Sequence, residues 1–319
     1  MKNQKQRPFR RVIAGGVACL ILFTPSVALG WGRAGHQIMA EIAARRLNSN
    51  AKSQIRELLY VKVKLAGSYS TPDFVAASFW GETKGFPELV RASTWADEIK
   101  TFPGYRQELS QLHFIENPFP NPGSAPAPNI VTALKEYVKT LQTSTDMQAK
   151  AKALRFIIHF VGDIHQPLHC AVRFDNEDNG DQGGNRVSIL VADSSGRLRP
   201  DRLHVYWDEG LNTFVGSTGS LADRIERANP DQPEIDPFNF QGWSDESFKL
   251  ARSVAYAGIP SGISSDSKFD SKSDKSGTKS AIRVTATYKA KALPVVNQQI
   301  AKSGYRLARL LNAIWPDRP

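Results

Sequence analysis

The hydrophobic residues of this chain recur mostly at helical spacing. A first set comprises Ile38, Met39, Ile42, Ala43 and Leu47, and a second comprises Ile55, Leu58 and Leu59. Residues three or four positions apart share one face of a helix, so each set predicts an amphipathic helix. Further helical patterns run over residues 87–100, 130–141, 153–166 and 295–314.

One stretch alternates in the manner of a β-strand. RVSILVA, residues 186–192, leads into the turn-forming residues 193–196, a pattern typical of a hairpin. We therefore predict a mainly helical fold with at most one small β-hairpin. We find no internal repeat, and 319 residues suffice for one large domain or two small ones.

The first thirty residues have a different composition. An apolar run over residues 12–23 follows a basic start and precedes the small-residue cleavage site Ala28-Leu29-Gly30. This order is typical of a secretory signal peptide, and the run is too short to span a bilayer comfortably. We expect residues 1–30 to be removed, leaving an exported protein, periplasmic or secreted, without a membrane anchor.

Removal of that segment changes the charge and the cysteine content. The formal charge falls from +10 to +5, because the first thirty residues carry five basic groups and no acidic ones. A mildly basic surface helps attract polyanions, nucleic acid or anionic lipid, without specifying either. Cys19 is lost and Cys170 remains, so the mature chain has no internal disulfide and depends on its core, on bound metal, or on both.

Residues 261–280 consist almost entirely of Ser, Lys, Asp and Gly. Such a composition offers almost nothing to bury. We expect a low-complexity surface loop there.

Histidine and aspartate are concentrated in HFVGDIHQPLH, residues 159–169. His159 and Asp163 stand one helical turn apart on the same face, and Gly162 between them allows close approach. Pro167 ends the helix and can turn His169 back towards the same space. A single His-x3-Asp pair is more often structural than metal-binding, so this segment alone leaves both interpretations open.

The same spacing recurs at His204 and Asp208. Imidazole and carboxylate together suit zinc and similar divalent metals, and a pair on one helical turn presents both with little ordering cost. His36, His113 and Asp97 are further candidates. Cleavage before Trp31 would add a free α-amine, whose proton a metal can displace near neutral pH.

Seven motifs, in their order along the chain, resemble those of the S1/P1 nuclease family of zinc-dependent, single-strand-preferring nucleases. They are WGRAGH (31–36), WADE (95–98), LHF (112–114), HFVGDIHQPLH (159–169), GGN (183–185), LHVYWD (203–208) and IAKSGYRLA (300–308). They span nearly the whole mature chain and are specific in combination. The resemblance implies one mainly helical catalytic domain over residues 31–319, in a bacterial member of the family.

The resemblance also implies three zinc ions and their ligands. Asp97, His113, His159 and Asp163 would bind the first zinc. Trp31 and His36 would bind the second, with Asp163 as a bridge. His169, His204 and Asp208 would bind the third, and His165 would be left to packing or to contacts with the ligands.

The implied reaction is hydrolysis of single-stranded DNA, RNA and 3′-nucleotides to 5′-phosphorylated products. A hydroxide held between the two adjacent zinc ions would attack phosphorus, and the third zinc would stabilise the departing 3′-oxygen. Asp97, Lys100 and Asp163 are the expected catalytic residues. The resemblance implies no stable protein partner.

Three residues are expected to contact the substrate. Lys100 stands where many family members carry arginine, and it keeps the charge but loses the bidentate geometry. Phe114 matches a base-stacking aromatic, and Asn185 resembles a polar residue of the cleft. The alternatives are a solvated surface lysine, a core phenylalanine and an asparagine with a role in a turn.

Two departures from the family and two other functions must be weighed. Many eukaryotic relatives contain disulfides, which this chain cannot form, and residues 261–280 have no family counterpart that we can place. A bacterial zinc-dependent phospholipase C resembles the family in its helical fold, N-terminal tryptophan and three-zinc arrangement, although the short Trp-to-His gap, Asp208 and GGN favour a nuclease. A non-catalytic zinc-binding protein would fill every coordination position from protein, whereas nine ligands for three metals leave positions open.

Overall fold

The computed structural model describes residues 31–64, 86–101, 105, 109–121, 123–174, 180–233, 236–260 and 281–317. The predicted signal peptide and the low-complexity stretch 261–280 lie outside the described residues, so those two predictions are not addressed by the fold.

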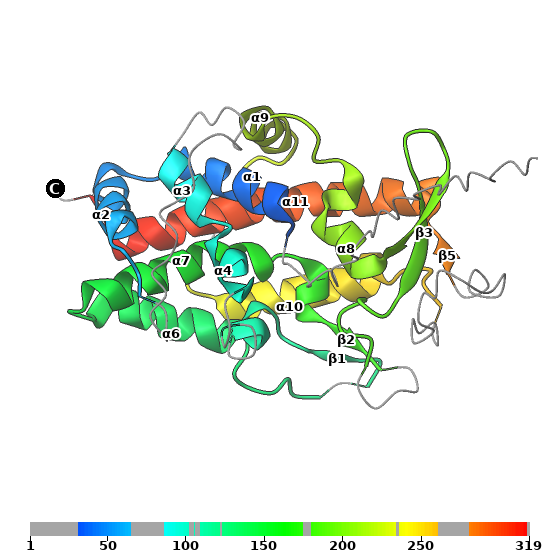
Figure 1. The fold of residues 1–319 in the computed structure, drawn as a ribbon, viewed down its shortest axis with the longest axis horizontal. Coiled ribbons are helices and arrows are strands. Elements are labelled where there is room, and N and C mark those ends of the chain that lie inside the picture. The colour runs from blue at the N-terminus through cyan, green and yellow to red at the C-terminus, as the bar shows by residue number, and fades with distance from the viewer. Residues whose placement is uncertain are drawn as a thin grey trace, which may run out of the picture.

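Helices dominate the described chain (Figure 1). The α-helices are α1 (Arg33–Ala44), α2 (Ser49–Tyr60), α3 (Pro87–Ala92), α4 (Trp95–Glu98), α6 (Ile130–Thr143), α7 (Met147–Asp163), α8 (Leu203–Asp208), α9 (Thr218–Ala228), α10 (Phe240–Leu250) and α11 (Ala286–Ile314). Shorter 3-10 turns are η2 (Ile99–Thr101), η3 (Ser110–His113), η4 (Pro167–Cys170) and η5 (Gly210–Asn212), and η6 (Ala251–Ala255) is a π-helical turn. The predicted mainly helical fold is confirmed.

Two helices begin earlier than predicted. α7 begins at Met147 rather than at residue 153, and α11 begins at Ala286 rather than at residue 295. Each has an N-cap: Asp146 accepts a hydrogen bond from the Gln148 N–H, and Thr285 accepts one from the Tyr288 N–H. The first turns of both helices are largely polar, so hydrophobic spacing does not reveal them.

The single helix predicted over residues 87–100 is two short helices, α3 and α4, followed by η2. The break lies at Ser93 and Thr94, whose hydroxyls donate to the carbonyls of Val90 and Arg91. Side-chain hydroxyls of this kind compete with the regular helical hydrogen bonds. After the break, α4 packs against α7.

The core forms around two buried helices that carry histidines. α1 packs against α11, α9 and α3, and α7 packs against α6, α2 and α4 (Figure 1). One apolar cluster surrounds Phe156 and Phe160 of α7, and a second surrounds Ile38 and Ile42 of α1. His36, His159 and Asp163 are therefore held on helices with almost no freedom to shift.

The predicted hairpin is present as β3 (Ser188–Ala192) paired antiparallel with β4 (Leu198–Arg202). Gly196 takes a left-handed φ of 80° in its turn, a conformation that costs glycine nothing. The sheets extend slightly beyond the prediction. β5 (Ile282–Arg283) pairs parallel with β3, and β1 (Pro118–Phe119) pairs parallel with β2 (Val172–Arg173), each too short to show a sequence period.

Two further expectations concern the membrane and the thiol. Among the helices that the structure describes, none combines the length and hydrophobicity needed to cross a bilayer.

Cys170 is fully buried, its thiol donates to the Ile164 carbonyl, and burial raises the pKa of the thiol to about 12. A thiol in that state is a packing residue rather than a nucleophile.

Candidate metal centre

Asp163, at the end of α7, is the centre of a group of side chains from four elements. Its Oδ1 lies 3.2 Å from Nε2 of His36 on α1. Its Oδ2 lies 2.8 Å from Nδ1 of His113 on η3 and 3.1 Å from Nε2 of His159, one turn earlier on α7. Asp97 of α4 completes the group, with Oδ1 3.4 Å from His159 Nε2 and 3.7 Å from His113 Nδ1. A carboxylate with histidines on both of its oxygens has the arrangement of a bridging metal ligand.

Gly162 explains how His36 comes so close to α7. A Cβ at this position would lie 2.7 Å from His36 Nδ1 and 2.8 Å from its Cε1. The imidazole instead lies over the bare backbone and stacks on His159, with ring centroids 3.9 Å apart and planes 17° apart. The predicted close approach at Gly162 is therefore confirmed.

A second group consists of His169, on η4, with His204 and Asp208, one turn apart on α8. The Nε2 atoms of the two histidines are 3.1 Å apart. Asp208 Oδ2 lies 3.5 Å from His204 Nε2, and its Oδ1 lies 3.9 Å from His169 Nε2. All three side chains are almost completely buried.

Backbone carbonyls fix the tautomers of three of these histidines. The Nδ1–H of His159 donates to the Ser93 carbonyl (2.7 Å). The Nδ1–H of His169 donates to the His113 carbonyl (2.7 Å), and that of His204 donates to the Gly183 carbonyl (2.6 Å). A carbonyl only accepts, so in the neutral ring Nε2 keeps its lone pair and points it into the group. In His169 and His204 two such lone pairs face each other, an arrangement that a metal ion or a proton between them would stabilise.

Burial and neighbouring charges shift the pKa values of these histidines, in opposite directions for different rings. Burial and the Lys100 ammonium lower the pKa of His113 to about 3, and burial and His169 lower the pKa of His204 to about 3. Both rings are therefore neutral at neutral pH, as metal ligands must be. Burial disfavours charge on His159, but Asp163 and Asp97 outweigh it and raise its pKa to about 10, so this position attracts positive charge.

Within the described part of the chain, two buried polar atoms of the first group, His36 Nδ1 and His113 Nε2, have no hydrogen-bond or ion-pair partner. Three more, His36 Nε2, Asp97 Oδ1 and Asp163 Oδ1, make ion-pair contacts but no hydrogen bond. Buried polar atoms without partners are rare in proteins. Their gathering at one point, with imidazole and carboxylate as the only donor types, fits zinc. The donor atoms form three compact sets, each within 4.8 Å: His36, His159 and Asp163; Asp97, His113 and His159; His169, His204 and Asp208.

A cavity of about 260 Å³ opens onto both groups. Its walls include the metal-ligand candidates His113, His169 and His204, together with all three residues predicted to contact substrate, Lys100, Phe114 and Asn185. Residues distant in the sequence thus line one cavity.

Comparison with known proteins agrees with this arrangement. A family model described as S1/P1 Nuclease matches residues 31–316. The chain belongs to the S1/P1 nuclease family. Endonuclease 2 of Arabidopsis thaliana is 26% identical over 99% of this chain and 100% of its own length. Nuclease S1 of Aspergillus oryzae is 24% identical over 93% and 96%, and nuclease P1 of Penicillium citrinum is 24% identical over 89% and 97%.

In this S1/P1 family member, the contacts of Lys100, Phe114 and Asn185 bear on the alternative roles that the sequence allows for each. Lys100 is only 6% exposed and its Nζ lies 2.8 Å from Asp97 Oδ1, so the alternative of a solvated surface lysine is wrong. Phe114 is partly exposed at the cavity rather than buried in the core. Asn185 donates to the Gln182 carbonyl at 3.0 Å, a turn contact, while it also lines the cavity.

Trp31 and His165 differ in their relation to the metal groups. Trp31 is fully buried, and the Gly32 N–H beside it donates to the Asp208 backbone carbonyl at 2.8 Å, which links the residues before α1 to α8.

His165 belongs to none of the three donor sets. Its Nδ1–H donates to the Val161 carbonyl and its Nε2 accepts from Arg306, both at 2.7 Å. Burial and the Arg306 charge lower its pKa to about 3, so it is a neutral packing residue.

Sequence reasoning missed two residues of the site. Gln166 donates from Nε2 to Asp208 Oδ1 at 2.6 Å. Glu116 lines the same cavity as Phe114. For Glu116 a signal existed, because residues two apart in extended backbone face the same side, and Phe114 is extended with φ −147° and ψ 170°. The contact of Gln166 depends on how α8 packs, which no local pattern reveals.

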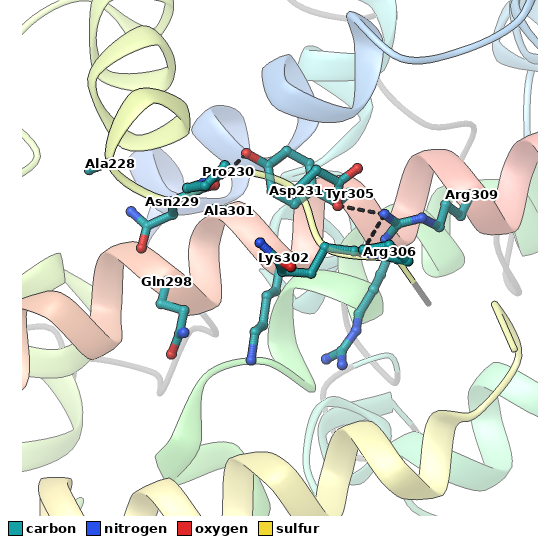
Figure 2. A pocket seen from close by; sticks show the side chains of 12 residues that line it. Ala228, Asn229, Pro230, Asp231, Gln298, Ala301, Lys302, Tyr305, Arg306 and Arg309 are labelled. Carbon is teal, nitrogen blue, oxygen red and sulfur yellow. Dashed lines mark hydrogen bonds and ion pairs between the residues drawn. The ribbon is translucent and has the colours of Figure 1, made fainter. Parts of the chain in front are cut away.

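A larger cavity, of about 430 Å³, lies away from the metal groups, between α11 and the segment after α9 (Figure 2). Its cationic side chains are held by acidic partners: Arg309 by Asp231, and Lys302 and Arg306 by Glu246. None of the metal-ligand candidates lines it. Of these two cavities, the smaller is therefore the one with metal-ligand candidates at its wall.

Proposed function

We propose that the protein is a zinc-dependent phosphodiesterase that hydrolyses single-stranded DNA and RNA, and 3′-nucleotides, to 5′-phosphorylated products. One observation carries the proposal: the cavity with His113, His169 and His204 in its wall also contains Lys100, Phe114 and Asn185. Family membership supports hydrolysis of nucleic acid esters, since the relatives are nucleases and endonucleases.

Three zinc ions are proposed, with the ligands that the resemblance implies. Asp97, His113, His159 and Asp163 would hold the first, Trp31, His36 and Asp163 the second, and His169, His204 and Asp208 the third. The three compact donor sets support this number. Bound zinc supplies a Lewis acid that polarises a phosphoryl oxygen and activates water near neutral pH.

The protein's own residues would bind and orient the substrate. Lys100 places a buried ammonium at the cavity wall, held against Asp97 at 2.8 Å, where it can attract a phosphate. The partly exposed ring of Phe114 offers a stacking face, which accepts any unpaired base and excludes paired ones. Asn185 can donate its second amide hydrogen while the first stays on Gln182.

The burial of Asp163 supports its role as the bridging ligand. Burial alone would raise the pKa of this carboxyl, but His159, His113 and His36 surround it and lower the pKa well below its ordinary value. It therefore stays ionised over the working pH range. Asp97 is held ionised in the same way by His159 and Lys100, against the effect of burial.

The two other functions make different predictions. A phospholipase C would use the same metal chemistry on a lipid, whereas the relatives that match over nearly the full chain are nucleases. A zinc-binding protein would close its metals off from solvent, whereas here three of the histidines line an open cavity. Nuclease activity is the function that the geometry supports best.

The decisive experiment uses protein beginning at Trp31, with zinc bound and after removal by a chelator. Each form is assayed on single-stranded DNA, RNA, a 3′-nucleotide and phosphatidylcholine vesicles. We expect zinc-dependent release of 5′-phosphorylated nucleotides. Cleavage of phosphatidylcholine alone would identify a phospholipase, and three bound zinc ions without turnover would identify a binding protein.

A further inference from the structure

Gln166 is a fully buried amide with both of its functional atoms engaged. Its Oε1 accepts from the Leu168 N–H at 2.6 Å, and its Nε2 donates to Asp208 Oδ1 at 2.6 Å. A backbone N–H can only donate, so the contact with Leu168 fixes the amide oxygen on that side. The amide NH2 must then face Asp208.

This orientation determines how Asp208 presents its carboxylate. The Gln166 amide occupies Oδ1, while Oδ2 faces His204 Nε2 at 3.5 Å. Oδ1 is thus held by a neutral donor and lies 3.9 Å from His169 Nε2, while Oδ2 is turned towards His204. A hydrogen bond to a ligating carboxylate restricts its rotation and lowers the ordering cost of binding a metal.

The same side chain also connects the two elements that supply the ligands. Its acceptor contact caps the start of η4, the turn that carries His169, and its donor contact reaches α8, which carries His204 and Asp208. η4 and α8 are far apart in the sequence. The two hydrogen bonds of the Gln166 amide link η4 directly to α8, beside the proposed ligands.

We propose that Gln166 is a positioning residue for the third zinc, fixing the Asp208 carboxylate relative to His169 through its two amide hydrogen bonds. The inference rests on the proposed function, because it assumes that His169, His204 and Asp208 bind a metal. It predicts that loss of the donor weakens one of three zinc ions and leaves the other two.

The chain offers a matched control in Gln299 of α11. It is also fully buried and also donates its amide to a carboxylate, Glu246, at 3.2 Å. None of the three donor sets includes Glu246. A substitution at Gln299 therefore removes a comparable hydrogen bond without touching the metal groups.

The test measures bound zinc per chain and competes zinc away with a chelator of known affinity. Wild type, Q166L, Q166E and Q299L are compared with D208N, each checked for folding by circular dichroism. Q166E keeps an acceptor for the Leu168 N–H and removes the donor to Asp208, so it decides the matter if Q166L does not fold. We expect both Gln166 variants to lower the affinity of one zinc by about 10- to 100-fold, and Q299L to match wild type.

A double variant identifies which zinc is affected. D208N should release the same single zinc, so Q166E combined with D208N should lose no more zinc than D208N alone. Wild-type affinity or tighter binding in Q166E overturns the proposal, as does equal weakening of all three ions. Wild-type protein that binds no zinc at the third group contradicts the proposed function as well, whereas a normal wild type with an unaffected Q166E contradicts only the role of Gln166.

Discussion

His169 and His204 face each other through their Nε2 atoms, 3.1 Å apart, while the Nδ1 of each ring is bonded to a backbone carbonyl. Neither neutral ring can donate to the other, so the lone pairs repel until a proton or a metal ion lies between the two nitrogens. Zinc bound at this point would remove the repulsion and favour the native state.

Removal of zinc should therefore destabilise the fold. Zinc at about 100 times its dissociation constant stabilises the native state by about 2.7 kcal/mol per site. We expect a chelator to lower the melting temperature in calorimetry and added zinc to restore it. Magnesium is the control, because sites rich in imidazole bind it poorly. A melting temperature insensitive to the chelator would contradict a structural contribution from zinc.

Replacement of Asp163 should be far more damaging than replacement of His165, two residues later. D163N removes the carboxylate that contacts His36, His113 and His159. We therefore expect loss of bound zinc and a fall in nuclease activity of more than about 100-fold, because loss of a residue that only holds a metal ligand in place usually lowers activity by about 10- to 100-fold. H165Q should keep its zinc. It breaks buried hydrogen bonds to Val161 and Arg306 and should cost about 1–3 kcal/mol of folding free energy.

Zinc content and urea unfolding, measured on both variants, separate the two effects. Equal losses of zinc from D163N and H165Q would show that the ligand assignment is wrong.

The spacing of ligands within one helical turn was visible in the sequence, whereas their meeting in space was not. His159 with Asp163 and His204 with Asp208 are four residues apart, and each pair does lie on a single helix. His36, Asp97 and His113 come from three other elements, and only the family resemblance grouped them. Nothing local in the sequence could show that the Ser93 carbonyl orients His159, because that contact joins the break after α3 to α7.

The surroundings of the cavity residues were equally hidden. Lys100 has the sequence neighbours of a surface lysine, yet it is buried, because η2 places it against Asp97.

The start of α11 was missed for a different reason. Residues 286–294 contain few large apolar side chains and include Pro294, so hydrophobic spacing does not reveal the first turns, which begin at the Thr285 cap.

Gly162 should not tolerate even a methyl group. In G162A the new Cβ would lie 2.7 Å from His36 Nδ1, and the ring cannot retreat because it is stacked on His159. We expect reduced zinc binding and activity as His36 is displaced. The matched control is G304A, whose Cβ would meet Ile42 at 2.6 Å and the Met39 carbonyl at 2.8 Å between α11 and α1; neither residue belongs to a donor set.

Both alanine variants should lose stability, by about 1–3 kcal/mol for overpacking, and only G162A should lose zinc. Unfolding in urea and zinc analysis on the same samples provide the comparison. Full zinc content in G162A would mean that His36 is not a ligand.

The role proposed for Trp31 depends on a free amine and is tested by extending the chain. One residue added before Trp31 converts the amine to an amide, which cannot ligate zinc as an amine does. We expect the extended protein to lose one zinc and to lose activity by orders of magnitude. The control is the same preparation after a protease has exposed Trp31, which should regain both. Full activity of the extended form would exclude the amine as a ligand.

Glu246 should give the fold a dependence on acid pH that is independent of the metal. Burial opposes ionisation of Glu246, but Lys302 and Arg306 beside its carboxylate outweigh this effect and lower its pKa from 4.5 to about 2. Between these two values the unfolded chain binds more protons than the native chain. The stabilisation from Glu246 is therefore complete above about pH 4.5 and is lost as the pH falls towards 2.

This contribution is measured as the difference in unfolding free energy between wild type and E246Q, with a chelator present throughout so that zinc ligation does not titrate. We expect a difference of the order of 2 kcal/mol at pH 6, since each pKa unit corresponds to about 1.4 kcal/mol and the pair is partly solvated. It should shrink steadily below pH 4.5. E57Q, at an exposed position of α2, is the control for the replacement of a glutamate by glutamine as such. A constant difference for E246Q between pH 6 and pH 3 would show that the carboxylate is not held ionised by Lys302 and Arg306.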